Sequence, residues 1–213
     1  MRGVEQIPWL YDAMMAISEW RGLARWRAWV AGGAGDRVLE VGCGSGRNLP
    51  HYDAETRVVA LEPDWTMLLV ARRRAPGAVL VLGRAEELPF AEEHFDTVVS
   101  ALVFCSVDDP DIALAEVGRV LRPGGELRMM EHVRSEHPVL GKLQDWSQPL
   151  WTRVAGGCRP NRCTEASVEA AGFVITSDGR RRSGVMRRFA ARWGGSSEPE
   201  PATESETAST PGP

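Results

Sequence analysis

The feature that most constrains the fold is an alternation of short apolar runs with helical stretches between residues 37 and 130. Runs typical of buried strands lie at 37–41, 58–61, 78–82, 97–102 and 126–130. Helical patterns lie between them at about 46–51, 64–75 and 110–121. Parallel strands need crossover helices, so this order predicts a doubly wound α/β fold whose mostly parallel sheet carries helices on both faces.

The N-terminal region has a different pattern. Apolar side chains between residues 8 and 31 recur at helical spacing, Gly22 divides the pattern, and the glycine-rich stretch 32–35 ends it. We expect residues 1–35 to form an N-terminal helical lid over a core domain of residues 36–193.

The end of that core is expected to depart from parallel pairing. A short helical pattern at 165–171 is followed by apolar runs at 173–176 and 185–190. We expect these two late runs to form an antiparallel strand pair.

The formal net charge of −4 resides in the last residues of the chain. Residues 194–213 hold four Glu, at 198, 200, 204 and 206, and no Lys, Arg or aromatic residue. A Pro/Ser/Thr/Glu tract of this kind has little to bury, and we expect a disordered acidic tail. Without these four Glu the chain has 25 acidic and 25 basic residues. Because residues 1–193 carry no excess of positive charge, we do not expect the chain to bind nucleic acid non-specifically.

Other classes of protein are disfavoured as well. No signal peptide is visible, and the most apolar segment, residues 98–107, is too short to span a membrane, so no integral membrane anchor is expected. Four scattered cysteines do not suggest a disulfide framework, which favours a cytoplasmic location. Cys158 and Cys163 have no nearby histidine at a zinc-binding spacing, so we expect no metal ion. Nothing in the sequence specifies an oligomeric state.

A glycine-rich loop leaves the first predicted strand as Gly42-Cys43-Gly44-Ser45-Gly46. Alternate glycines permit a tight turn and let a ligand approach bare backbone. The helix expected next would present free N–H groups to an anion. The dinucleotide pattern G-x-G-x-x-G fails in both registers, at Arg47 and at Leu49, so a smaller anion such as a carboxylate fits better than a pyrophosphate.

Glu62 ends the second predicted strand, where an acidic side chain can accept hydrogen bonds from ribose hydroxyls. Each feature has a structural alternative, because the glycines can simply close a turn and Glu62 can cap the helix that begins near Asp64. Their occurrence together, after successive strands, favours a nucleoside ligand.

With these residues the chain resembles the class I S-adenosylmethionine-dependent methyltransferases. The resemblance is strongest over residues 36–133 and rests on five motifs in order: residues 38–46, Glu62, residues 83–90, residues 95–99 and residues 120–125. It implies a Rossmann-like fold and S-adenosyl-L-methionine as cofactor.

The resemblance also implies the residues that hold the cofactor. They are Glu40, Gly42, Cys43, Gly44, Ser45, Gly46, Glu62, Pro63, Ala85, Glu86, Ala101 and Leu102. Many relatives have Gly-Asp-Ala where this chain has Gly83-Arg84-Ala85, and an arginine cannot accept a bond from the adenine amino group. Either Glu86 or the backbone around Ala85 takes that role.

The second half of the chain narrows the comparison. Residues 104–107, 131–133 and 156–162 are similar to a subgroup that includes animal alkyl-thiol methyltransferases, with broader kinship to quinone and phospholipid methyltransferases. This similarity, together with tryptophans at 9, 20, 26, 29, 146 and 151, favours a small hydrophobic acceptor: a thiol, a quinone-like molecule or a lipid.

Two residues are candidates for the acceptor side. His132 follows the fifth predicted strand and could remove a proton from a thiol or hydroxyl, and Tyr11 could close over the cleft from the lid. Both also have structural interpretations, as a packed histidine and a packed tyrosine. Two other functions stay open, a catalytically inactive cofactor-binding interaction protein and a nucleotide-dependent oxidoreductase, although the failed glycine spacing disfavours the latter.

Overall fold

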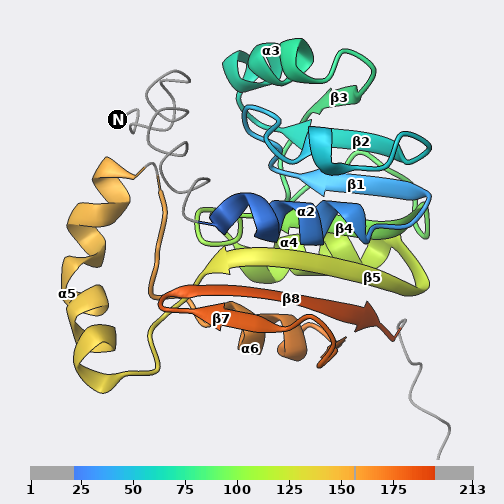
Figure 1. Cartoon of the computed structure of the whole chain (residues 1–213). Helices are drawn as coiled ribbons and strands as arrows, with labels where there is room; N and C mark the ends of the chain where they lie inside the picture. The colour runs from blue at the N-terminus through green and yellow to red at the C-terminus, as the bar shows by residue number, and fades with distance from the viewer. Residues whose placement is uncertain (1–21, 156, 195–213) are drawn as a thin grey trace, which may run out of the picture.

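The structure, a computed structural model, describes residues 22–155 and 157–194, and these contain one mixed sheet (Figure 1). The sheet has the order β3-β2-β1-β4-β5-β8-β6, and β7 pairs with β8 beside this path. The strands are β1 (Arg37–Val41), β2 (Arg57–Glu62), β3 (Val79–Leu82), β4 (Phe95–Ala101), β5 (Leu121–His132), β6 (Phe173–Ile175), β7 (Arg181–Ser183) and β8 (Met186–Trp193).

The pairing directions agree with the sequence prediction. Strands β1 to β5 pair in parallel, and β8 pairs antiparallel with β5 and with β6. The helices are α2 (Ala24–Gly32), the 3-10 helix η3 (Leu49–His51), α3 (Trp65–Arg74), α4 (Pro110–Val120), α5 (Pro138–Val154) and α6 (Thr164–Ala170). Figure 1 shows α2 and α4 on opposite faces of the sheet, and the doubly wound α/β architecture is therefore confirmed.

Alternate strand residues build the two faces of the core. Val38 and Val99 are fully buried in one hydrophobic cluster with Val30 of α2. Their neighbours Leu39 and Val98 point to the other face and belong to the cluster that contains α4. Complete burial of a Val or Leu side chain contributes about 1.5–3 kcal/mol, so both helix layers are held firmly on the sheet.

One predicted helix is wrong. Residues 46–51 contain only the short 3-10 helix η3, in which Pro50 occupies an early position. Gly42, Gly44 and Gly46 all adopt positive φ, a conformation that cannot continue into a regular helix. The helix N-terminus expected to receive an anion is therefore missing after the glycine loop.

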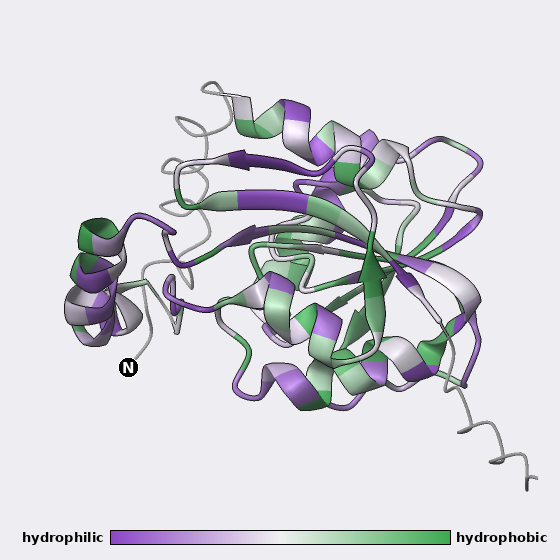
Figure 2. Ribbon diagram, turned by 90° about the horizontal axis from the view of Figure 1, so that it is seen from below, coloured by the Kyte–Doolittle hydropathy of each residue, from purple (hydrophilic) through white to green (hydrophobic). Residues whose placement is uncertain are grey.

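The sequence patterns also do not indicate α5, because Gly141 and Pro149 interrupt its apolar spacing. Figure 2 shows this helix standing apart from the sheet, with hydrophobic and hydrophilic residues on its surface. Its exposed apolar residues are Val139, Leu140, Leu143, Trp146, Leu150 and Trp151. No helix among the described residues is long and apolar enough to cross a membrane.

The described part of the expected N-terminal lid packs on the sheet. The Arg128 guanidinium of β5 donates hydrogen bonds to the carbonyl oxygens of Trp29, at 2.6 Å, and Val30, at 2.9 Å, near the end of α2. Residues 1–21, which include Tyr11, and the predicted tail from residue 195 lie outside the described residues, so the lid and the division of the chain at residue 35 stay predictions.

Candidate active site

A cavity of about 710 Å³ lies at the carboxyl ends of β1, β2 and β4. Every predicted cofactor-binding residue except Gly46 lines it: Glu40, Gly42, Cys43, Gly44, Ser45, Glu62, Pro63, Ala85, Glu86, Ala101 and Leu102. Ligands of open α/β sheets bind in the crevice at this edge, where the strand order reverses, and β1 and β4 flank that point here.

The three loop glycines have different surroundings. A Cβ added at Gly44 (φ +54°) would meet no atom within 4 Å, whereas one at Gly42 (φ +65°) would come within 2.5 Å of Val103. Gly46 lies against Ala71 of α3, where an added Cβ would be 3.0 Å from the nearest atoms. Gly44 is therefore the position at which a ligand can approach the backbone, and Gly46 serves the packing of the loop on α3.

Replacing Gly44 with leucine tests this difference. The side chain would enter the cavity, and an overlap costing about 1–3 kcal/mol weakens cofactor binding by roughly 5–150-fold. Gly184 is the matched control, because it also has positive φ (+55°) with nothing within 4 Å of an added Cβ, but lies in the turn between β7 and β8. Titration calorimetry should show weakened binding in Gly44→Leu alone; equal affinities in both variants would contradict the assignment.

Glu62 stabilises the glycine loop through hydrogen bonds to the backbone. Its carboxylate accepts a hydrogen bond from the Gly44 N–H at 2.9 Å and from the Asp64 N–H at 3.1 Å. Burial raises the pKa of this carboxyl above its usual value. Glu62 does not cap α3, because Asp64 does so by accepting hydrogen bonds from the N–H groups of Thr66 and Met67. The capping alternative is therefore excluded.

A buried polar chain supports the other side of the cavity. The Arg27 guanidinium donates to the Asn48 side-chain oxygen at 2.7 Å, and the Asn48 amide donates to Glu40 Oε1 at 3.1 Å. The Glu40 side chain is almost completely buried, and desolvation raises its pKa to about 7. The buried Tyr52 hydroxyl is a further neighbour of this carboxylate, and its hydrogen bond opposes the rise in pKa. The sequence patterns singled out neither Arg27 nor Asn48, because no local spacing connects them to Glu40.

An ion pair connects the segments that follow β3 and β4. Arg84 lies 2.6 Å from Asp108, and Glu86 accepts a hydrogen bond from the Asp108 N–H at 2.9 Å. All three residues line the cavity. Both alternatives for the adenine contact, Glu86 and the backbone around Ala85, stay predictions.

Glu131 organises the loop after β4. Its carboxylate is fully buried and accepts hydrogen bonds from the N–H groups of Val103 (2.9 Å), Phe104 (3.1 Å) and Cys105 (3.3 Å). Burial raises the pKa of Glu131, and these backbone donors oppose the rise. The sequence contains no distinctive signal for this role, because β5 also carries charged residues at Glu126 and Arg128.

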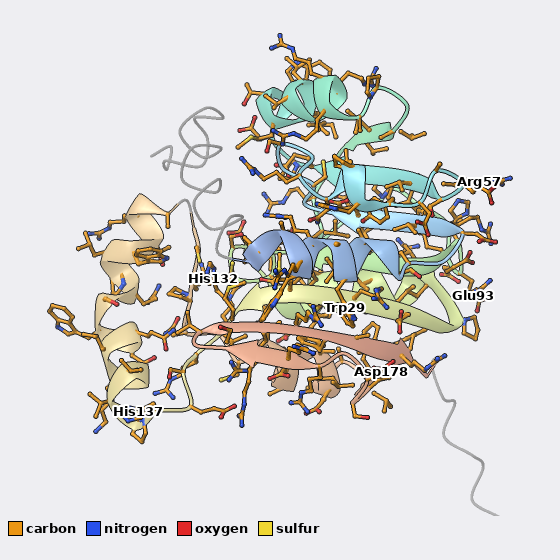
Figure 3. All side chains as sticks on the ribbon, viewed as in Figure 1. Trp29, Arg57, Glu93, His132, His137 and Asp178 are labelled. Carbon is orange, nitrogen blue, oxygen red and sulfur yellow. The ribbon has the colours of Figure 1, made fainter. Side chains whose placement is uncertain are left out.

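His132 lies at the end of β5, on the same side of the molecule as α5 (Figure 3). It does not line the cavity, and its imidazole lies instead beside the sulfur atoms of Cys105 and Cys158. A hydrogen bond between these two thiols raises the pKa of Cys105 and lowers that of Cys158, which His132 lowers further.

The described tryptophans of the N-terminal region stack on arginine side chains. Trp26 and Trp29 stack with the guanidinium of Arg188, and Trp29 also stacks with Arg128. Neither lines the cavity, whereas Trp65, at the start of α3, does. Trp26 and Trp29 therefore pack against arginine side chains and not against the cavity.

Comparison with known proteins identifies the family. The methyltransferase domain family matches residues 39–129. The chain is 40% identical over 176 residues to the demethylmenaquinone methyltransferase of Renibacterium salmoninarum. The matched region covers 80% of this chain and 71% of that protein. The chain is a class I S-adenosylmethionine-dependent methyltransferase. S-adenosylmethionine is accordingly its cofactor.

Two further comparisons extend this result. The methyltransferase is 35% identical over 144 residues to the human thiol S-methyltransferase TMT1B, covering 64% of this chain and 59% of that protein. Its fold is similar to that of a SAM-dependent methyltransferase from Thermotoga maritima, with a TM-score of 0.67, 23% identity, and coverage of 89% of this chain and 97% of that one. The methyltransferase thus spans little more than half the length of its thiol-methylating relative.

Proposed function

We propose that this methyltransferase acts on a small hydrophobic acceptor: a thiol, a quinone-like molecule or a lipid. The observation that carries the proposal is the loop after β4, which contributes the apolar side chains of Leu102, Val103 and Val107 to the cavity. Relatives named for a quinone and for thiols support the same chemistry. The exposed apolar residues of α5 give such an acceptor a hydrophobic surface on the methyltransferase.

The residues of the cavity fit the cofactor. Glu62 would accept hydrogen bonds from the ribose hydroxyls, and the backbone at Gly44 would lie against the methionine moiety. The Glu40 carboxylate, which lines the cavity, would accept a hydrogen bond from the methionine ammonium group. Arg27 and Arg47 also line the cavity. Their positive charges would compensate the negative charge of the methionine carboxylate, a role first expected for a helix N-terminus.

The chain contributes mainly positioning to the reaction. When bound, the cofactor supplies a methyl group on a positively charged sulfur, which is already a strong electrophile. The protein has to align the acceptor and exclude water. Glu131 would serve alignment by fixing the loop that carries Val103.

Thiol and hydroxyl acceptors also have to lose a proton. The sequence predicts His132 and Tyr11 for the acceptor side, and these assignments stay proposals. In the structure His132 lies next to two thiols rather than at the cavity wall, so its contribution to the acceptor side would be indirect.

A methyl-transfer assay tests the proposed acceptor class. The full chain is incubated with labelled S-adenosylmethionine and an alkyl thiol, a phenol, a reduced naphthoquinone or phospholipid vesicles, and methylated products are identified by mass spectrometry. We expect turnover with at least one of these apolar acceptors. Turnover confined to polar amines, amino acids or protein would contradict the proposal.

A further inference from the structure

Two cysteines and a histidine from three separate segments meet beside the cavity. Cys105 comes from the loop after β4, His132 from the end of β5, and Cys158 from the connection between α5 and α6. One ligand atom from each side chain lies within 4.8 Å of the other two. Cys105 is buried, whereas His132 and Cys158 are partly accessible. An ion can therefore reach the cluster from solvent.

The backbone around the cluster is fixed by contacts outside it. The Cys105 N–H donates to Glu131 at 3.3 Å, and its carbonyl accepts from the Arg159 N–H at 2.6 Å. The Cys158 carbonyl accepts a hydrogen bond from the Thr152 hydroxyl at 3.0 Å. These bonds hold both cysteines in place before any ligand binds, which lowers the entropic cost of forming a site.

The Arg162 guanidinium reinforces the same arrangement. It donates to the carbonyl oxygens of Phe104 and Val107, on either side of Cys105. The segment that carries Cys158 is thus tied to the loop that carries Cys105, and both cysteines keep their positions relative to β5.

The ligand set matches a thiophilic metal ion. Zn²⁺ binds cysteine sulfur at about 2.3 Å and histidine nitrogen at about 2.0–2.1 Å, which places tetrahedral ligand atoms roughly 3.5–3.8 Å apart. Since the ligand atoms already lie within 4.8 Å of one another, each pair has to approach by at most about 1.3 Å to reach these separations. Three protein ligands leave one coordination position for water.

We propose that Cys105, His132 and Cys158 together bind a single Zn²⁺ ion. Both thiols release their protons to solvent when the ion binds, and the two thiolates compensate its charge. An imidazole nitrogen that coordinates the ion does not also accept a proton, so the site assigns His132 to the metal. Cys163 takes no part, because it is exposed and does not belong to the cluster. The proposal does not depend on which acceptor is methylated, but it replaces the proton-accepting role that the sequence predicts for His132.

Metal titration of the full chain tests the site. The reduced protein is freed of metal with a chelator and titrated with Zn²⁺ in competition with a chromophoric chelator. We expect one Zn²⁺ per chain. Co²⁺, used as a spectroscopic probe, should give a thiolate-to-metal charge-transfer band. Bound Zn²⁺ is also expected to protect the partly accessible Cys158, but not the exposed Cys163, from alkylation.

Two variants and one control test which residues bind the ion. Cys158→Ser and His132→Ala should each weaken Zn²⁺ binding by more than the roughly 10–100-fold that loss of an outer-shell partner costs. Cys163→Ser is the matched control and should bind as the unmodified chain does. The two deciding variants change partly exposed side chains, and retained S-adenosylmethionine binding shows that each is folded.

Several results would overturn the site. One is a reduced chain that takes up no Zn²⁺, and another is a Cys158→Ser variant that binds Zn²⁺ as tightly as the unmodified chain. A third such result is a chain that is isolated with a Cys105–Cys158 disulfide and still binds no metal after the disulfide is reduced. Each is independent of the acceptor assay, so failure of the metal site and failure of the proposed acceptor class are distinguishable.

Discussion

Replacing Glu62 with alanine is expected to weaken S-adenosylmethionine binding by about 1.5–3 kcal/mol, or roughly 10–150-fold in Kd. The variant loses the carboxylate proposed to bind the ribose hydroxyls. It also loses the acceptor that holds the Gly44 N–H at 2.9 Å, which loosens the loop proposed to hold the methionine moiety. Isothermal titration calorimetry with the cofactor or with S-adenosylhomocysteine measures the effect.

The matched control for this variant is Glu55→Ala, which removes the same charge from an exposed position outside the cavity. Burial disfavours the ionised form of Glu62, so its removal takes a desolvated charge out of the folded state and is not expected to unfold the chain. Unchanged cofactor affinity in a folded Glu62→Ala variant would refute the ribose assignment.

Replacing Glu131 with alanine is expected to lower the free energy of unfolding by about 3–5 kcal/mol. The N–H groups of Val103, Phe104 and Cys105 lose the carboxylate that accepts their hydrogen bonds, and those of Phe104 and Cys105 are buried. The cavity left by the side chain adds to the loss. Urea unfolding followed by circular dichroism measures the change.

Glu131→Gln separates shape from charge. Its amide oxygen can still accept from Val103 and Phe104, but its NH₂ group faces the Cys105 N–H, so we expect an intermediate loss of stability. Glu169→Ala, an exposed glutamate of α6, should stay within about 0.5 kcal/mol of the unmodified chain. A loss below about 1 kcal/mol for Glu131→Ala would show that the loop does not depend on this carboxylate.

The strands of the sheet were predictable because their signal is local. Residues 37–41 and 78–82 were predicted almost at the bounds of β1 and β3, because short runs rich in Val and Leu that are bounded by glycines are a local strand signal. The helix predicted at residues 46–51 is wrong because the local pattern there does not specify the backbone conformation. Polar residues after a glycine loop favour a helix in most α/β proteins, but here the positive φ of Gly46 and the ring of Pro50 limit it to one 3-10 turn.

The cavity was predictable to a similar extent, but its supporting residues were not. The glycine loop and Glu62 follow the ends of successive strands, and strand ends meet at one edge of a parallel sheet. Asn48 and Arg27 support Glu40 from positions that share no periodicity with it. Their role depends on how α2 packs across the sheet, which a local pattern does not specify.

The sequence by itself determined the doubly wound sheet, the glycine loop and the acidic residue after β2, because strand periodicity and the need for positive φ are properties of neighbouring residues. Only the tertiary structure brought Cys105, His132 and Cys158 together. Their proximity depends on the parallel pairing of β4 with β5 and on the path of the chain from α5 to α6. The cysteine pair that is close in sequence, Cys158 and Cys163, does not form the cluster, because the chain between them directs only the first thiol toward the end of the sheet.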